Sequence, residues 1–83
     1  MQFKIFSIRD SKAEAFNTPI FLATEGQAIR MFDYMCNKPD STIAMHPEDY
    51  TLFALGEFND ITGLVEALPT PKSLGLAVEF IKS

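Results

Sequence analysis

The chain has 83 residues, a formal net charge of −4 and a sequence pI of about 4.7. This length allows one hydrophobic core, so we expect a single compact domain over residues 1–83. The acidic balance argues against strong, nonspecific nucleic-acid binding through phosphate contacts, because such binding normally requires a basic surface. Because Cys36 is the only cysteine, the chain cannot form an intrachain disulfide, and this composition is compatible with a reducing compartment.

The first residues, MQFKIFSIRD, lack the basic segment, long apolar run and small-residue cleavage site of a signal peptide. No apolar run in the sequence approaches the roughly 20 residues that span a bilayer. We therefore expect a cytoplasmic protein without a membrane partner.

In the N-terminal quarter of the chain, two short segments have the composition of β-strands. Residues 3–8 (FKIFSI) are aromatic or β-branched at most positions, and both alternating sets contain apolar side chains. This pattern predicts a strand that is central or covered on both faces. Residues 13–17 are expected to form a loop or a single helical turn. Residues 19–23 predict a short strand whose leading proline places it at a strand start or a sheet edge.

The next segment carries the signals of an amphipathic helix. Thr24 is placed as the N-cap, Gln27 has the spacing of a capping box, and Pro39 would stop the helix, which predicts a helix over residues 25–38. Its apolar positions recur at helical spacing and form one stripe: Ala28, Met31, Phe32, Met35 and Cys36. Residues 42–45 are expected to add a brief helical turn.

The C-terminal half predicts a β-hairpin followed by a second helix. Residues 50–58 are expected to form the longest strand and residues 64–68 its partner, joined by the five-residue turn 59–63 with glycine available for a positive φ. Thr70 and Pro71 have the pattern of N-cap and first helical residue, which predicts a helix over residues 71–82. The expected fold is therefore α+β, with a small antiparallel sheet of three to four strands and two amphipathic helices.

The predicted C-terminal helix has a wide apolar arc, formed by Leu74, Leu76, Val78, Phe80 and Ile81. A domain this small is marginally stable, and the chain has neither a disulfide nor an evident metal cage to reinforce it. We therefore expect a homodimer in which this arc is buried.

Residues suited to catalysis or metal binding are sparse. His46, Glu48 and Asp49 lie together, but one histidine and one cysteine fall short of a zinc site, and a proline with paired acids before an aromatic run is typical of a loop that enters a strand. Cys36 lies on the apolar helix stripe, where a buried inert thiol is expected. We expect no enzyme activity, cofactor or metal.

A locally basic face remains compatible with the acidic total. Cations can follow the phosphates of single-stranded DNA while aromatic rings stack on its bases. The residues that fit these roles are the cations Lys4, Arg9, Lys12 and Arg30, with Tyr34 as the exposed stacking ring. The alternative is that the neighbouring aromatic rings are core residues and the cations are simply solvated.

Three blocks of the sequence resemble the small non-structural protein of gokushoviruses, the single-stranded-DNA phages of the Microviridae: DSKAEAFNTPIF (10–21), HPEDYTLFALGEFND (46–60) followed by Thr62-Gly63, and TPKSLGLAVEF (70–80). The intervening AIRMF (28–32) also matches. Asn59 stands where this pattern has an acidic residue. We expect the difference to alter only the hairpin turn.

This resemblance implies a protein of the infected bacterial host's cytoplasm that binds single-stranded DNA in viral genome synthesis or packaging. It implies no catalytic motif. The alternative is a module that binds phage replication or capsid proteins without contacting DNA.

Overall fold

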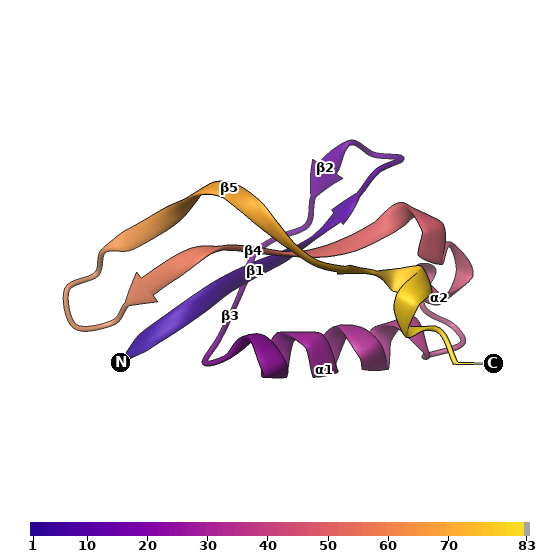
Figure 1. The fold of residues 1–83 in the computed structure, drawn as a ribbon, viewed down its shortest axis with the longest axis horizontal. Coiled ribbons are helices and arrows are strands. Elements are labelled where there is room, and N and C mark those ends of the chain that lie inside the picture. Colours follow the sequence, from indigo (N-terminus) through magenta and orange to yellow (C-terminus); the bar gives the residue numbers. More distant parts are fainter. Residues whose placement is uncertain (83) are drawn as a thin grey trace.

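The computed structural model describes residues 1–82, which form an antiparallel sheet with a helical layer on one side (Figure 1). The strands are β1 (Gln2–Asp10), β2 (Ala15–Phe16), β3 (Ile20–Leu22), β4 (Tyr50–Asn59) and β5 (Val65–Leu76). The helical elements are α1 (Glu25–Cys36), α2 (Thr42–Met45) and the 3-10 turns η1 (Pro47–Asp49) and η2 (Ala77–Phe80). β4 lies between β1 and β5, and both β2 and β3 pair with the other edge of β1.

The α1 helix begins where its capping residues predict. The Thr24 side-chain oxygen accepts a hydrogen bond from the Gln27 backbone N–H at 3.1 Å, and the Gln27 side chain accepts one from the Ala23 N–H at 3.0 Å. Both bonds satisfy backbone donors that would otherwise be unpaired at the start of the helix. The helix ends at Cys36, two residues before the predicted end, and Asn37 caps it by donating to the Asp33 carbonyl at 2.9 Å.

The β4–β5 hairpin confirms the predicted turn. The Asn59 N–H donates to the Leu64 carbonyl at 3.0 Å, the Gly63 N–H donates to the Asn59 carbonyl at 2.8 Å, and Gly63 has a φ of 75°. Glycine tolerates this φ without the steric cost that a Cβ would add. The short strand at 20–22 and the helical turn at 42–45 also follow the prediction, whereas residues 15–16 form a strand in place of the expected loop.

The predicted C-terminal helix over residues 71–82 is wrong. The segment continues β5 as far as Leu76 and then forms only the single 3-10 turn η2. Its pairing with β4, from Thr51↔Leu76 to Ala54↔Lys72, satisfies backbone groups along β4 that a helix here would leave unpaired. Gly75 has a φ of 147°, which is incompatible with a helix. The fold is therefore α+β with a five-stranded sheet and one main helix, and not three to four strands with two helices.

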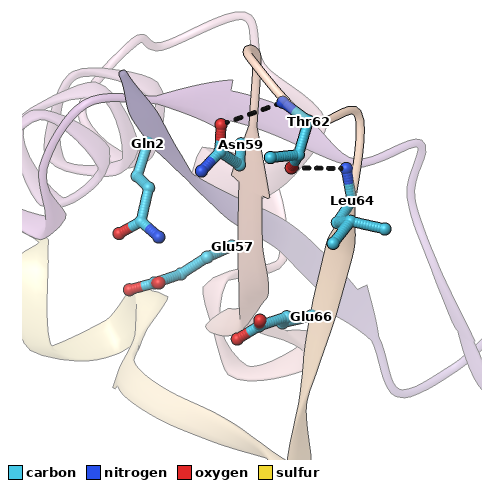
Figure 2. A pocket seen from close by; sticks show the side chains of 6 residues that line it. All are labelled: Gln2, Glu57, Asn59, Thr62, Leu64 and Glu66. Carbon is cyan, nitrogen blue, oxygen red and sulfur yellow. Dashed lines mark hydrogen bonds between the residues drawn. The ribbon is translucent and has the colours of Figure 1, made fainter.

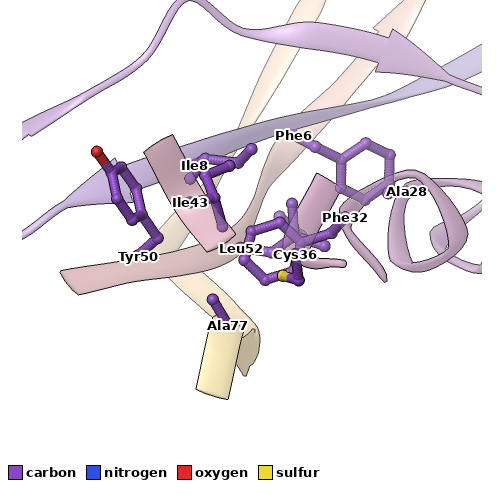
Figure 3. Close-up of a cluster of buried hydrophobic side chains, with 10 residues drawn as sticks. Phe6, Ile8, Ala28, Phe32, Cys36, Ile43, Tyr50, Leu52 and Ala77 are labelled. Carbon is purple, nitrogen blue, oxygen red and sulfur yellow. The ribbon is translucent and has the colours of Figure 1, made fainter. Parts of the chain in front are cut away.

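The hydrophobic core lies between α1 and one face of the sheet (Figure 3). Its fully buried side chains are Phe6 and Leu52 from the sheet, Ala28, Phe32 and Cys36 from α1, and Ala77 from η2. Phe80 of η2 closes one end through an edge-to-face contact with Phe32, with 5.4 Å between the ring centroids. No helix within residues 1–82 is long and apolar enough to cross a membrane.

We predict that Gly56→Ala destabilises the protein by about 2–3 kcal/mol. A Cβ at this position would overlap the Glu66 carbonyl oxygen and approach the Ala67 Cα to 3.0 Å, and both atoms belong to the β5 backbone. Urea unfolding measures the change. Gly26→Ala is the matched control, because its Cβ has space in the first turn of α1 and should leave stability unchanged or raise it by about 0.5 kcal/mol. Equal effects of the two substitutions would contradict the prediction.

Candidate nucleic-acid interface

The outer side of α1 presents an aromatic ring between two cations. Ala28 and Phe32 face the sheet, so Arg30 and Tyr34, each two residues further along the helix, point away from it. Tyr34 is 67% exposed. Lys38 follows Tyr34 by four residues, just past the end of the helix. Arg30, Tyr34 and Lys38 therefore lie along one exposed line.

These three residues border an open groove of about 390 Å³. Lys82, from the C-terminal segment, lines the same groove, and its ammonium lies 3.5 Å from the Asp33 carboxylate. The Lys82 backbone N–H also donates to the Asn37 side chain at 2.9 Å, which holds this segment against the end of α1. Within residues 1–82, Arg30 and Lys38 make no ion pair, so their charges remain available to an anionic ligand.

The other three predicted cations lie elsewhere. Lys4 is on the same side of the sheet as the core residue Phe6, and its ammonium lies 3.7 Å from the Glu57 carboxylate. Arg9 is on β1, and because Ile8 faces α1, Arg9 points to the opposite side of the sheet. Lys12 is in the exposed turn between β1 and β2. The structure thus brings Arg30 and Tyr34 together and separates them from Lys4, Arg9 and Lys12.

The side of the sheet that α1 does not cover forms an open face. It carries five of the eight phenylalanines: Phe3, Phe16, Phe21, Phe53 and Phe58. Phe16 contacts Phe53 and Phe21 contacts Phe58 in edge-to-face geometry, with 5.4 and 5.8 Å between ring centroids. Arg9 is the only charged strand residue that the register places on this face within the described chain.

The opposite side of the sheet, beyond the start of α1, is acidic. Figure 2 shows a small polar pocket of about 110 Å³ in which Glu57 and Glu66, from neighbouring strands, lie close to Gln2 and Asn59. The Lys4 ammonium pairs with the Glu57 carboxylate and so balances one of the two negative charges. A phosphate would be repelled here, so this pocket is a poor candidate for nucleic acid.

The cluster at residues 46–49 is a turn that leads into a strand, as expected. Pro47–Asp49 form η1, which runs directly into β4. The structure nevertheless brings ligand-type atoms of His46, Glu48 and Asp49 within 4.8 Å of one another at the surface. Burial, followed by the Asp10 and Asp49 carboxylates, raises the pKa of the adjacent Tyr50 hydroxyl.

Two features of the surface were not found from the sequence. Lys38 and Lys82 both line the groove on α1. The place of Lys38 could have been predicted, because it follows Tyr34 by four residues and residues four apart lie on the same face of a helix. The place of Lys82 could not be predicted in this way, because it depends on the C-terminal segment folding back onto α1. The partition of the phenylalanines between the core and the open face depends on strand register, which the sequence alone left undetermined.

The fold and surface define a small α+β protein with a cationic groove on its helix and an aromatic face on its sheet. The family model for the Phage ORF5 protein matches residues 3–80, and the chain belongs to this family of phage proteins. No curated protein and no solved structure matches the chain.

Cys36 is the one thiol, and its environment makes it unreactive. Its side chain is 1% exposed, and burial, aided by the Asp33 carboxylate, raises the pKa of the thiol from 9.0 to about 11. The thiolate is the reactive form of cysteine. Folding therefore lowers the reactivity of Cys36 both by shielding its sulfur from reagents and by raising the pKa of its thiol.

We predict that folded Cys36 resists a thiol reagent at pH 9 and reacts fully once denaturant unfolds the chain. Between about pH 9 and 11 the unfolded thiol loses its proton while the folded one keeps it. The free energy of unfolding should therefore fall as the pH rises through this window, and Cys36→Ala should reduce that dependence. Rapid labelling of the folded protein at pH 9 would contradict this account.

Proposed function

We propose that this phage protein is a non-enzymatic accessory protein that binds single-stranded DNA in viral genome synthesis or packaging, through the groove on α1. The observation that carries the proposal is the exposed Tyr34 ring lying between Arg30 and Lys38, two cations that form no ion pair among the residues that the structure describes. Stacking rings flanked by cations are the usual means of binding single strands without sequence preference.

The groove suits this ligand despite the acidic net charge. Its own carboxylate, Asp33, is matched by Lys82 at 3.5 Å. Glu79, which lines the adjoining hollow beside Arg30, accepts a hydrogen bond from the Leu76 N–H at 3.2 Å. Both carboxylates are engaged within the protein. With few cations the affinity should be modest and its salt dependence shallow, because each cation in contact with a phosphate adds only about 0.7 to the slope of log K against log salt.

The resemblance to the gokushovirus non-structural protein supports the same function in the infected host cell, and the membership of the Phage ORF5 family supports a role in a phage cycle. A second candidate function is a module that regulates the replication complex or procapsid through protein contacts alone. The largely apolar open face favours that alternative, because exposed apolar patches often mark protein interfaces.

We predict that a labelled single-stranded oligonucleotide binds at low salt, and that Arg30→Ala lowers the affinity and reduces the slope of log K against log salt by about 0.7. Fluorescence anisotropy at several salt concentrations measures both quantities. Arg9→Ala is the matched control, because it removes the same charge from the opposite side of the molecule. Absence of binding at low salt would favour the protein-interaction module, whereas sensitivity to Arg9 alone would place the DNA on the open face.

A second substitution tests the ring. Tyr34→Ala should weaken binding by roughly 1–3 kcal/mol, the usual loss when a base-stacking aromatic residue is truncated. Tyr34→Phe keeps the ring and should bind almost as well as the unaltered protein. Because Tyr34 is 67% exposed, neither change should affect the thermal midpoint appreciably. Equal loss in both variants would argue against stacking.

A further inference from the structure

The open face of the sheet exposes several large apolar side chains. Phe16 is 42% exposed, Phe21 50% and Val65 62%. Full side-chain areas near 200 Å² for a phenylalanine imply that these three residues alone expose on the order of 300 Å². The half-buried Phe3 and Phe58, which line an open groove of about 300 Å³ with Phe21 and Val65, add to this patch. Patches of roughly 300–600 Å² are the largest that a typical monomer exposes, and they are often functional surfaces.

The dimensions of the chain also indicate an uncovered layer. Its accessible surface is 5384 Å² and its radius of gyration 13.1 Å. A compact monomer of 9.3 kDa is expected to have about 5000 Å² and about 12 Å. In Figure 1 the β4–β5 hairpin and the start of β1 extend past α1, so this end of the sheet has no helix against it. The strand sequence FKIFSI, apolar on both alternating faces, is typical of a strand covered on both sides.

We propose that a second copy of this chain covers the open face, so that two sheets pack face to face in a homodimer. A standard interface buries about 800 Å² per partner, of which roughly 500 Å² is apolar. The phenylalanine and valine side chains of the open face supply most of that area. The proposed interface is the sheet and not the C-terminal segment. In that segment Leu74 and Phe80 pack into the subunit's own core, and only Leu76, Val78 and Ile81 of the predicted apolar arc are exposed.

Charge favours a second copy over a nucleic acid as the occupant. The acidic strand residues Asp10, Glu57 and Glu66 all lie on the helix side, so two open faces meet without opposing carboxylates. Arg9 is the single strand cation on the face, and it lies at the end of β1 away from Phe3, at the rim of the patch. One cation provides little affinity for a phosphate chain.

The sheet edges disfavour dimerisation by strand addition. Pro69 and Pro71 lie in β5, the outer strand on one side, and Pro19 precedes β3 on the other. Proline lacks the backbone N–H that an added strand would need, and it is a common protection of sheet edges. Face-to-face packing is therefore the arrangement that the surface permits.

Sedimentation velocity tests the proposal with charged substitutions. The unaltered protein should sediment at twice the 9.3 kDa monomer mass at micromolar concentration. Phe21→Glu places a charge in the proposed interface and should raise the dimer dissociation constant at least about 100-fold. Val78→Glu is the matched control, because Val78 is 46% exposed on the C-terminal segment, and it should leave the dimer intact.

Val65→Glu provides a second test at the same groove, and circular dichroism checks that each variant is folded. A monomeric unaltered protein at all concentrations would overturn the proposal. Dissociation by Val78→Glu but not by Phe21→Glu or Val65→Glu would also overturn it, in favour of a C-terminal interface. If the unaltered protein is monomeric and Phe21→Glu abolishes oligonucleotide binding, the open face is instead the DNA-binding surface. The sedimentation outcomes do not depend on Arg30 or Tyr34, so the dimer proposal and the DNA proposal can fail separately.

Discussion

The packing of α1 against one face of the sheet is the contact on which the rest of the structure depends. Phe32 and Cys36 of the helix and Phe6 and Leu52 of the sheet are all at most 1% exposed, and Ala28 allows the two layers to approach closely. One twelve-residue helix covers only one side of a five-stranded sheet. Two consequences follow directly. The polar side of α1 is turned to solvent with its cations and tyrosine, and no helix within residues 1–82 covers the other face of the sheet.

The parts of the fold that the sequence predicted correctly are those fixed by neighbouring residues. Thr24 and Gln27 mark the start of α1 because both side chains bond backbone groups within four residues. Gly63 marks the hairpin turn because its positive φ is a local requirement. Runs rich in aromatic and aliphatic residues located β1 and β4 to within two residues at each end. For the helix cap and the turn, the interaction that determines the structure lies within a few positions of the residue that indicates it. The two strands were found from their composition, although their ladder joins residues as distant as Gln2 and Asn59.

The errors arose where a distant partner decided the outcome. Thr70 and Pro71 have a valid helix-start pattern, yet the segment is a strand because β4 offers it a ladder of backbone hydrogen bonds. Leu68 to Pro71 lie between the two paired parts of β5, opposite Leu55, so the prolines occupy positions that the ladder does not need. The predicted binding residues lie on different sides of the molecule for the same reason. Helical spacing places Arg30 and Tyr34 together, but only strand register shows that Arg9 faces away from them and that Lys4 meets Glu57.

The distribution of side chains over the two layers makes the two proposed interactions compatible. Cations around an exposed tyrosine lie on the helix, whereas apolar rings lie on the far side of the sheet, so DNA and a second subunit do not compete for the same surface. Sheets that pack through their open faces would produce four layers, with a helix on each outer side. Each outer helix would then present its groove to solvent, and one dimer would offer two grooves facing in opposite directions. A protein with few cations gains most from such an arrangement, because two weak sites on one particle bind a long strand more tightly than either site alone.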